Sequence, residues 1–253
     1  MRVDVLNTIG LSMMLMGVMC WVALIVSKPR TPRLVLGVSA GVMASVISLL
    51  TPLLWTTWRT RWLPWPIESY INGVHNLGEP QPWLFPIFPW SAFAFVGLAA
   101  GFLLFSDWAK KLGAILFVLI GVSGVGMVYL SLWLDRGPIQ IYPVYDYWHT
   151  SPNFFLLRVG LLLVILLAAY VWCRWGAGQW GFSPLIQLGQ TSLLVYWVHI
   201  EFVYGRFSIM HRQAWDIRGA SAGLLTIFVA MLVLSVARTK WKKPRKILPT
   251  PAL

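Results

Sequence analysis

The sequence has few charged residues and almost no cysteine. Charged side chains make up 11% of its 253 residues, whereas hydrophobic side chains make up 58%. This balance excludes an ordinary soluble domain and predicts an integral membrane protein. The two cysteines, Cys20 and Cys173, fall in separate apolar runs, so they lack the clustered spacing of a zinc or redox site and are expected to be packing residues.

The sequence also lacks the short motifs that mark several kinds of chemistry. It contains no phosphate-binding P-loop, no GxSxG nucleophile elbow and no HExxH zinc motif. The formal net charge of +12 would suggest nucleic-acid binding in a soluble protein, but in a membrane protein such an excess usually records orientation. We therefore expect neither a bound metal nor a nucleic-acid partner.

Long apolar runs are the main feature that the sequence does contain. A helix needs about 20 apolar residues to cross a bilayer. Seven runs meet this requirement: 5 to 27, 33 to 55, 88 to 106, 112 to 134, 154 to 173, 184 to 204 and 219 to 237. The sequence therefore predicts an all-α bundle of about seven spans that forms one transmembrane domain over residues 1–253.

The basic residues predict how this bundle is oriented. Every lysine falls in alternate connections or in the tail 238–253, which places all lysines on one side of the membrane. The positive-inside rule names that side cytoplasmic. We therefore expect the N-terminus outside, a basic C-terminal tail in the cytoplasm, and all four histidines on the outer side.

The run 184 to 204 carries two ionisable residues, His199 and Glu201, near its outer end. They are two positions apart, so on a helix they point in different directions and do not form a pair by themselves. Ionisable groups at membrane depth are costly and are functional candidates for that reason. The alternative is that both are wetted by headgroup water or bonded for packing.

The outer connection 135 to 153 contains a second histidine, His149, close to Asp146. A carboxylate beside an imidazole fixes its tautomer and raises its basicity, as a general base requires. The alternative is a structural role in which His149 caps the start of the next helix. The outer connection 56 to 87 is also long and rich in aromatic residues, and such loops usually cover or form a site.

Glycines spaced by four residues predict where helices approach one another closely. Three such pairs are present: Gly37/Gly41, Gly97/Gly101 and Gly219/Gly223.

Four phrases together resemble a known family. They are RVDVLNTIGLS at 2 to 12, FPIFPWSAFAFVGLAAG at 85 to 101, YWHTSPNFFLLRVGL at 147 to 161 and LGQTSLLVYWVHIEFVYG at 188 to 205. Their order and spacing resemble bacterial membrane proteins related to heparan-alpha-glucosaminide N-acetyltransferase, within the transmembrane acyltransferase group. The resemblance implies transfer of an acetyl group from cytoplasmic acetyl-CoA to a sugar-like acceptor across the membrane.

The sequence departs from this family at its beginning. Related proteins usually open with an LDxxRG-like phrase followed by an outward-facing histidine, and neither is present here. We therefore expect that an N-terminal part with an odd number of crossings is missing, which would also account for an outside N-terminus. No catalytic residue can be carried over from the family.

The residues that remain suggest where this chemistry would take place. Acetyl transfer needs a base and donors for the oxyanion. The candidate catalytic residues are His199, His149, Asp146 and Glu201; those for acceptor binding are Trp90, Trp148, Tyr196 and Arg206; those for acetyl-CoA binding are Lys110, Lys111 and Arg174. The alternatives are a non-enzymatic transport or binding subunit and an inactive, truncated remnant. The expected partners are the lipid bilayer of a bacterial plasma membrane, a glycan acceptor and a second copy or a missing N-terminal half.

Overall fold

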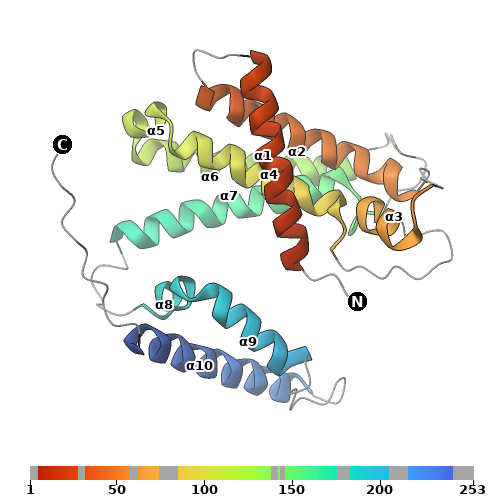
Figure 1. The fold of residues 1–253 in the computed structure, drawn as a ribbon. Coiled ribbons are helices and arrows are strands. Elements are labelled where there is room, and N and C mark those ends of the chain that lie inside the picture. The colour runs from red at the N-terminus through yellow and green to blue at the C-terminus, as the bar shows by residue number, and fades with distance from the viewer. Residues whose placement is uncertain are drawn as a thin grey trace. The chain divides into compact units, whose positions relative to one another are not determined.

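The computed structural model describes residues 5–27, 32–56, 62–73, 85–137, 142, 146–175, 183–204 and 216–241. These residues form ten α-helices and include no strand, which confirms the all-α prediction for this part of the chain (Figure 1). The helices are α1 (Val5–Ser27), α2 (Pro32–Thr56), α3 (Trp65–Asn72), α4 (Ile87–Leu104), α5 (Asp107–Leu112), α6 (Ala114–Asp135), α7 (Pro152–Trp175), α8 (Pro184–Gln190), α9 (Ser192–Tyr204) and α10 (Ile217–Trp241).

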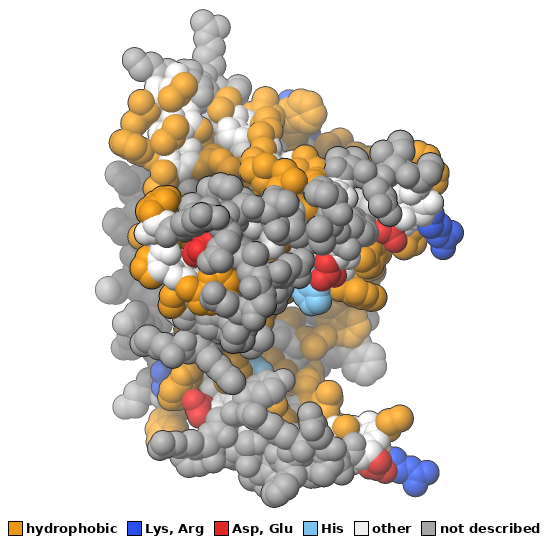
Figure 2. Space-filling view, turned by 90° about the vertical axis from the view of Figure 1, so that its right-hand side faces the viewer, with side chains coloured by type: hydrophobic (Ala, Val, Ile, Leu, Met, Phe, Trp, Pro, Cys, Tyr) orange, Lys and Arg blue, Asp and Glu red, His pale blue; other side chains and the backbone are white. Residues whose placement is uncertain are grey.

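Six of these helices, α1, α2, α4, α6, α7 and α10, are long and apolar enough to cross a membrane. Their outward surfaces carry large hydrophobic side chains, and Figure 2 shows hydrophobic side chains exposed over much of one face, with charged ones in few places. Such surfaces are unstable in water and stable in lipid. The chain is therefore an integral membrane protein.

The predicted span 184 to 204 is divided into two helices. α8 ends at Gln190 and α9 begins at Ser192, and the backbone of Thr191 between them departs from helical angles (φ −117°, ψ 21°). Glycine at 189 favours such a break because it weakens a helix. Neither half is long enough to cross a bilayer alone.

Two short helices lie where the sequence predicted only connections. Prolines open α3, which ends where Gly73 adopts a left-handed conformation (φ 68°), as is common at helix ends. At α5, the hydroxyl of Ser106 accepts a hydrogen bond from the Ala109 amide and caps the first turn. The predicted spans 88 to 106 and 112 to 134 therefore flank a distinct helical turn.

The described residues divide into two compact units, residues 1–170 and residues 171–253. Unit 1 holds α1 to α6 and most of α7, and unit 2 holds the end of α7 with α8, α9 and α10. Each unit is described separately below.

The core of unit 1 lies where α2 packs against α4, with α1 beside both. Ala40 and Ala44 of α2 and Ala92 of α4 are buried, and Phe95 fills the space beside them. Small side chains let helix backbones approach closely, which is how helices associate where lipid supplies no hydrophobic driving force.

A close helix contact in unit 1 involves glycines that the four-residue spacing does not mark. A Cβ atom added at Gly124 of α6 would lie 2.6 Å from the carbonyl oxygen of Gly160 of α7. At Gly41, Gly97 and Gly101, an added Cβ would meet nothing within 4 Å. The prediction of close packing is therefore wrong for Gly97/Gly101, because that face of α4 has no neighbour within the described residues.

Unit 2 is held together by hydrogen bonds between α8 and α10. The Gln187 side-chain amide donates to Ser235 Oγ at 3.0 Å and to Thr239 Oγ1 at 2.6 Å, and Thr191 Oγ1 donates to Ser235 Oγ at 2.6 Å. Ser235 is fully buried and in turn donates to the Gln187 carbonyl. These bonds join the break between α8 and α9 to the last turns of α10.

Unit 1 has two distinct ends because its helices alternate in direction. The end of α2 meets the start of α4 where Trp55 Nε1 donates to the Phe88 carbonyl, and the end of α6 meets the start of α7 where Ser131 donates to the Asn153 carbonyl. We call this the histidine end, because His149 lies there. The start of α2 and the end of α4 form the other, the lysine end.

Candidate functional site

The site begins with a tight turn directly before α7, built around Asp146. One carboxylate oxygen, Oδ1, accepts the Trp148 amide at 3.0 Å, and the Asp146 carbonyl accepts the amides of Thr150 and Ser151 at 3.0 Å each. Asp and Asn favour such turns because their side chains bond the backbone a few residues ahead. The turn fixes the direction of the Asp146 side chain.

The second oxygen of this carboxylate holds His149. Nδ1 of His149 lies 2.7 Å from Asp146 Oδ2, so the structure brings together the two residues that the sequence placed three positions apart. Because a carboxylate only accepts hydrogen bonds, Nδ1 of the neutral imidazole carries the proton and Nε2 is the basic nitrogen. The two side chains are 60% and 47% exposed, so a substrate can reach the pair.

An indole ring supports the imidazole. The Trp55 ring stacks on His149 with ring centroids 6.3 Å apart and an interplanar angle of 22°. Trp55 is itself buried and its Nε1 donates to the Phe88 carbonyl at 3.0 Å. The orientation of His149 is therefore set by Asp146 on one atom and by the Trp55 ring on its face.

The alternative role of His149 as a helix cap is filled by Ser151. The Ser151 hydroxyl accepts the amides of Asn153 at 3.0 Å and Phe154 at 3.3 Å, which are the first unpaired donors of α7. His149 is thus one turn outside the helix and is not needed to begin it.

Two of the predicted acceptor-binding residues, Trp148 and Trp90, belong to one aromatic cluster at the histidine end. Trp148 is 65% exposed and contacts the Phe154 ring edge to face, with centroids 5.0 Å apart. Trp90 of α4 packs on Phe85 at 5.0 Å and on Phe93 at 6.0 Å. The two predicted residues therefore lie in two separate groups of contacting rings, and the sequence did not single out most of the other rings.

Arg158 joins the two parts of this cluster, and the sequence analysis missed it. Its guanidinium carbon lies 4.0 Å from the centroid of Phe154 and 5.6 Å from that of Trp90. The signal was present, since Arg158 is a single cation inside an apolar run. The basic candidates came from the ends of spans and from the connections, so a cation inside a span was not considered.

A buried carboxylate, Glu68, also went unnoticed. It lies in the first turn of α3, where the helix dipole favours negative charge, and only 1% of it is exposed. Its neighbours Ser69 and Asn72 are fully buried. The helix that hides these groups falls in a stretch read as a loop, which is why no buried face was predicted there. In a separate contact, the Tyr142 hydroxyl donates to the Leu49 carbonyl at 2.9 Å, and burial raises the pKa of this phenol.

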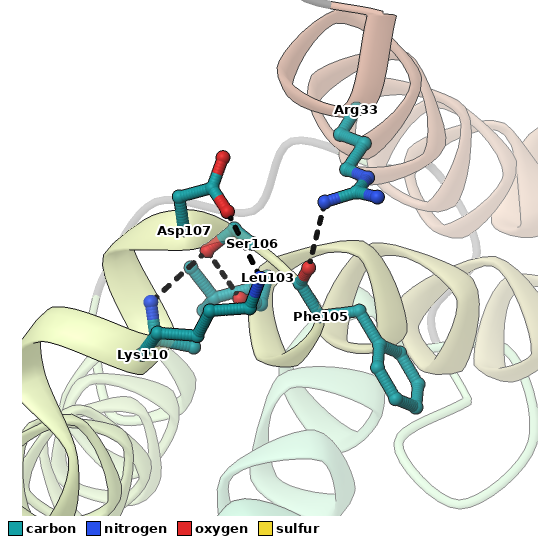
Figure 3. Close-up of polar contacts among 7 residues, drawn as sticks. Arg33, Leu103, Phe105, Ser106, Asp107 and Lys110 are labelled. Carbon is teal, nitrogen blue, oxygen red and sulfur yellow. Dashed lines mark hydrogen bonds and ion pairs between the residues drawn. The ribbon is translucent and has the colours of Figure 1, made fainter. Parts of the chain in front are cut away.

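The lysine end of unit 1 holds the predicted donor-binding lysines (Figure 3). Lys110 Nζ lies 3.3 Å from Asp107 Oδ1, and both side chains are about three-quarters exposed (74% and 75%). Arg33 at the start of α2 donates to the Phe105 carbonyl at 3.3 Å, which joins α2 to the end of α4. Lys111 is exposed and has no ion pair among the described residues.

The other predicted residues belong to unit 2 or lie outside the described residues. In α9, His199 Nδ1 is 3.1 Å from the Val195 carbonyl and its ring contacts Tyr196 edge to face at 5.6 Å. Within the described ranges, no contact joins His199 to Glu201, as their spacing predicted. Arg174 is exposed in the last turn of α7, and Arg206 lies outside the described residues.

Across the part of the chain that the structure describes, no three His, Cys, Asp or Glu side chains come together as a metal site would require. Comparison of the chain with family models, with curated proteins and with solved structures gives no match. The function is therefore inferred from the sequence and from the contacts described above.

Proposed function

We propose that the chain is a membrane-embedded acyltransferase that moves an acetyl group from cytoplasmic acetyl-CoA to a sugar or glycan acceptor outside a bacterial plasma membrane. The contact that carries this proposal is the 2.7 Å pair of Asp146 and His149. An imidazole with its Nδ1 proton on a carboxylate has Nε2 as its basic nitrogen, which is the atom that a general base uses.

In the reaction, His149 takes up one proton and later releases it. His149 Nε2 takes the proton from an acceptor hydroxyl or amine as the acceptor oxygen or nitrogen attacks the thioester carbonyl. The carbon–sulfur bond then breaks, the acetyl group stays on the acceptor, and coenzyme A leaves as a thiol after taking the proton from His149. Asp146 stabilises the imidazolium between these two steps.

The aromatic cluster supplies a surface for the acceptor. Trp148 is largely exposed and directly precedes His149. Flat aromatic faces bury the apolar face of a sugar ring and leave its hydroxyl groups free for hydrogen bonds. A sugar lying on Trp148 would therefore present a hydroxyl or amine to the neighbouring imidazole.

In this proposal the donor binds from the lysine end. Lys111 and Lys110 would bind the phosphates of acetyl-CoA, with Lys111 the more available because Lys110 pairs with Asp107. Helix α4 has 18 residues, so at about 1.5 Å per residue the two ends are about 27 Å apart. The pantetheine arm must therefore extend between the helices to bring the thioester toward His149.

Unit 2 supplies a second histidine on the proposed outer side. The Val195 carbonyl accepts a hydrogen bond from His199 Nδ1, so Nε2 of this neutral imidazole is also left as the basic atom. From the sequence alone, we assign His199 and Glu201 to proton transfer, with Tyr196 and Arg206 as acceptor contacts and Arg174 as a contact of the donor phosphates.

The proposed topology has seven crossings, with the N-terminus outside. α8 and α9 would form one broken crossing, at which Thr191 Oγ1 donates to Ser235 Oγ and Ser235 Oγ donates to the Gln187 carbonyl. A green fluorescent protein fused after residue 253 should fluoresce in bacteria, whereas alkaline phosphatase fused there should be inactive. Active phosphatase at this position would contradict the orientation.

The test of the activity is transfer of radiolabelled acetyl from acetyl-CoA to a mixed sugar acceptor by the purified chain in liposomes. His149→Ala should reduce turnover about 100-fold or more, the usual contribution of a positioned base. Added imidazole should restore part of the lost turnover of His149→Ala and leave the wild type unchanged. Asp135→Asn, an exposed acidic change at the same end of unit 1, should keep normal turnover.

Calorimetry with acetyl-CoA separates this proposal from a non-enzymatic binding subunit. A transferase should bind acetyl-CoA, and Lys111→Gln should weaken this binding more than it lowers the maximal rate. Acceptor binding without donor binding or transfer would instead favour a subunit that recognises sugars through the aromatic cluster.

A further inference from the structure

Arg158 is a cation within an apolar span. It is the seventh residue of α7, and the next basic residue in the helix is Arg174 near its other end. At about 1.5 Å per residue it lies about 10 Å from the start of the helix. A charged side chain at such a depth is costly and is kept where it has a partner or a function.

The described neighbours of Arg158 are aromatic rings and not carboxylates. Phe154 lies one turn before it on α7, and Trp90 approaches from α4. The carboxylate of Asp146, in the turn before α7, is engaged by the Trp148 amide and by His149. Within the residues that the structure describes, Arg158 makes no hydrogen bond or ion pair.

The two rings fix the position of the Arg158 guanidinium but accept none of its N–H hydrogen bonds. Aromatic faces attract a cation and fix its position, but they leave the N–H groups, which lie in the plane of the guanidinium, without acceptors. Arg158 is partly exposed, so a ligand can reach it. A planar fork of donors fits an oxyanion bidentately.

We propose that Arg158 binds an oxyanion carried by the acceptor, which would be a carboxylate, sulfate or phosphate group on a sugar. This inference rests on the proposed acyl transfer, because it names the acceptor class of that site. The Phe154 ring beneath Arg158 contacts Trp148, the residue before His149. An acceptor anchored by its anion at Arg158 would therefore extend across Trp148 toward the catalytic imidazole.

The same chemistry has a second source, the phosphate of a phospholipid headgroup. The test therefore measures binding by calorimetry with the full chain in nanodiscs of zwitterionic lipid. Glucose 6-phosphate and glucuronic acid are the anionic probes, and glucose is the neutral one. Wild type should bind both anionic sugars about 10- to 100-fold more tightly than glucose, the effect expected for charge-assisted hydrogen bonds.

Three variants decide whether Arg158 is responsible. Arg158→Gln should abolish the preference for anionic sugars, and Arg158→Lys should keep only part of it because an ammonium group lacks the bidentate fork. Arg136→Gln is the matched control, since Arg136 is an exposed arginine at the same end of unit 1. It should bind the anionic sugars as the wild type does.

The outcomes separate this inference from the activity on which it rests. Equal binding of anionic and neutral sugars by folded wild type, or an unchanged preference in Arg158→Gln and Arg158→Lys, overturns the anion site. Anion-selective binding that depends on Arg158, without any acetyl transfer, leaves the site standing and removes the proposed reaction. A third outcome is that wild type shows no sugar preference in zwitterionic lipid and loses sugar binding in nanodiscs with anionic lipid. This result would assign Arg158 to lipid headgroups and overturn the proposed acceptor class.

Discussion

The two ends of unit 1 carry acid–base pairs of the same spacing in different surroundings. At the histidine end, Asp146 and His149 are 2.7 Å apart; at the lysine end, Asp107 and Lys110 are 3.3 Å apart. Both pairs join residues three positions apart, and both are largely exposed. Exposed pairs of this kind contribute little to stability, so their difference must be sought in what surrounds them.

The surroundings give the two pairs different chemical capacities. Asp146 is fixed by the turn before α7 and His149 is stacked on Trp55, so the imidazole has one defined orientation. The Lys110 side chain is flexible and 74% exposed. Its ammonium group can donate hydrogen bonds but cannot accept them. The histidine end can therefore move a proton, whereas the lysine end offers charge to an anion.

The largest expected effect is the difference in acetyl transfer between two variants, Asp146→Asn and Asp107→Asn, each of which neutralises the acid of one pair. On the proposed function, Asp146→Asn should lower acetyl transfer about 100-fold, the lower range of what a positioned base contributes. The amide NH2 group can donate to Nδ1 and so favour the wrong tautomer, and the neutral amide does not stabilise the imidazolium. Asp107→Asn should leave the maximal rate within about twofold of wild type. Turnover in liposomes at saturating acetyl-CoA measures both.

This comparison can fail in two distinguishable ways. Equal turnover of Asp146→Asn and wild type would mean that the pair is structural. Equal losses of turnover in both variants would mean that both acids are needed for folding. Circular dichroism of the purified variants would then show a lower helix content than in the wild type.

The sequence predicted the parts of the molecule that depend on local pattern. Long apolar runs gave the positions of α1, α2, α4, α6, α7 and α10 to within a few residues, because burial in lipid requires uninterrupted apolar length. The Asp146 and His149 pair was predictable because a turn brings residues three positions apart together. This pair could be predicted from local sequence alone, because it does not depend on contacts between distant segments.

The rest depends on contacts between distant segments. Arg158 meets Trp90 across two helices, and no spacing in the sequence relates residues 68 positions apart. The close approach of Gly124 and Gly160 is also a property of two helices, so a four-residue rule within one helix did not find it. The break at Thr191 is stabilised by a hydrogen bond from Thr191 to Ser235 of α10. The apolar run from 184 to 204 is continuous in the sequence, so it did not predict this break.

A smaller effect is expected from the glycine contact that places α6 beside α7. Gly124→Ala would put a methyl group 2.6 Å from the Gly160 carbonyl, so the helices must separate, at a cost of about 1–3 kcal/mol for overpacking. This should loosen the histidine end, because Ser131 of α6 holds the start of α7 through the Asn153 carbonyl. Thermal unfolding of the purified chain in detergent measures the change.

The matched control for this variant is Gly97→Ala. A methyl group at Gly97 meets nothing within 4 Å, and alanine favours a helix by up to about 1 kcal/mol over glycine. Its melting temperature should equal or exceed that of wild type. A lower melting temperature for Gly97→Ala than for Gly124→Ala would show that α4, and not the α6–α7 contact, limits stability.

The smallest expected difference separates the two serine caps, one at each end of unit 1. Ser151 caps α7, a helix of 24 residues, and Ser106 caps α5, a helix of six. Each serine-to-alanine change removes a cap worth about 1 kcal/mol. The loss at Ser151 should appear in global unfolding because α7 packs on α6, whereas a short exposed helix such as α5 can open locally without unfolding the rest.

Two measurements check this difference. Hydrogen exchange should show that Ser106→Ala accelerates exchange only around residues 107–112, with an unchanged melting temperature. Ser151→Ala should lower the melting temperature. A global loss from Ser106→Ala as large as that from Ser151→Ala would mean that the lysine end is as firmly built as the histidine end, and that the two differ in chemistry alone.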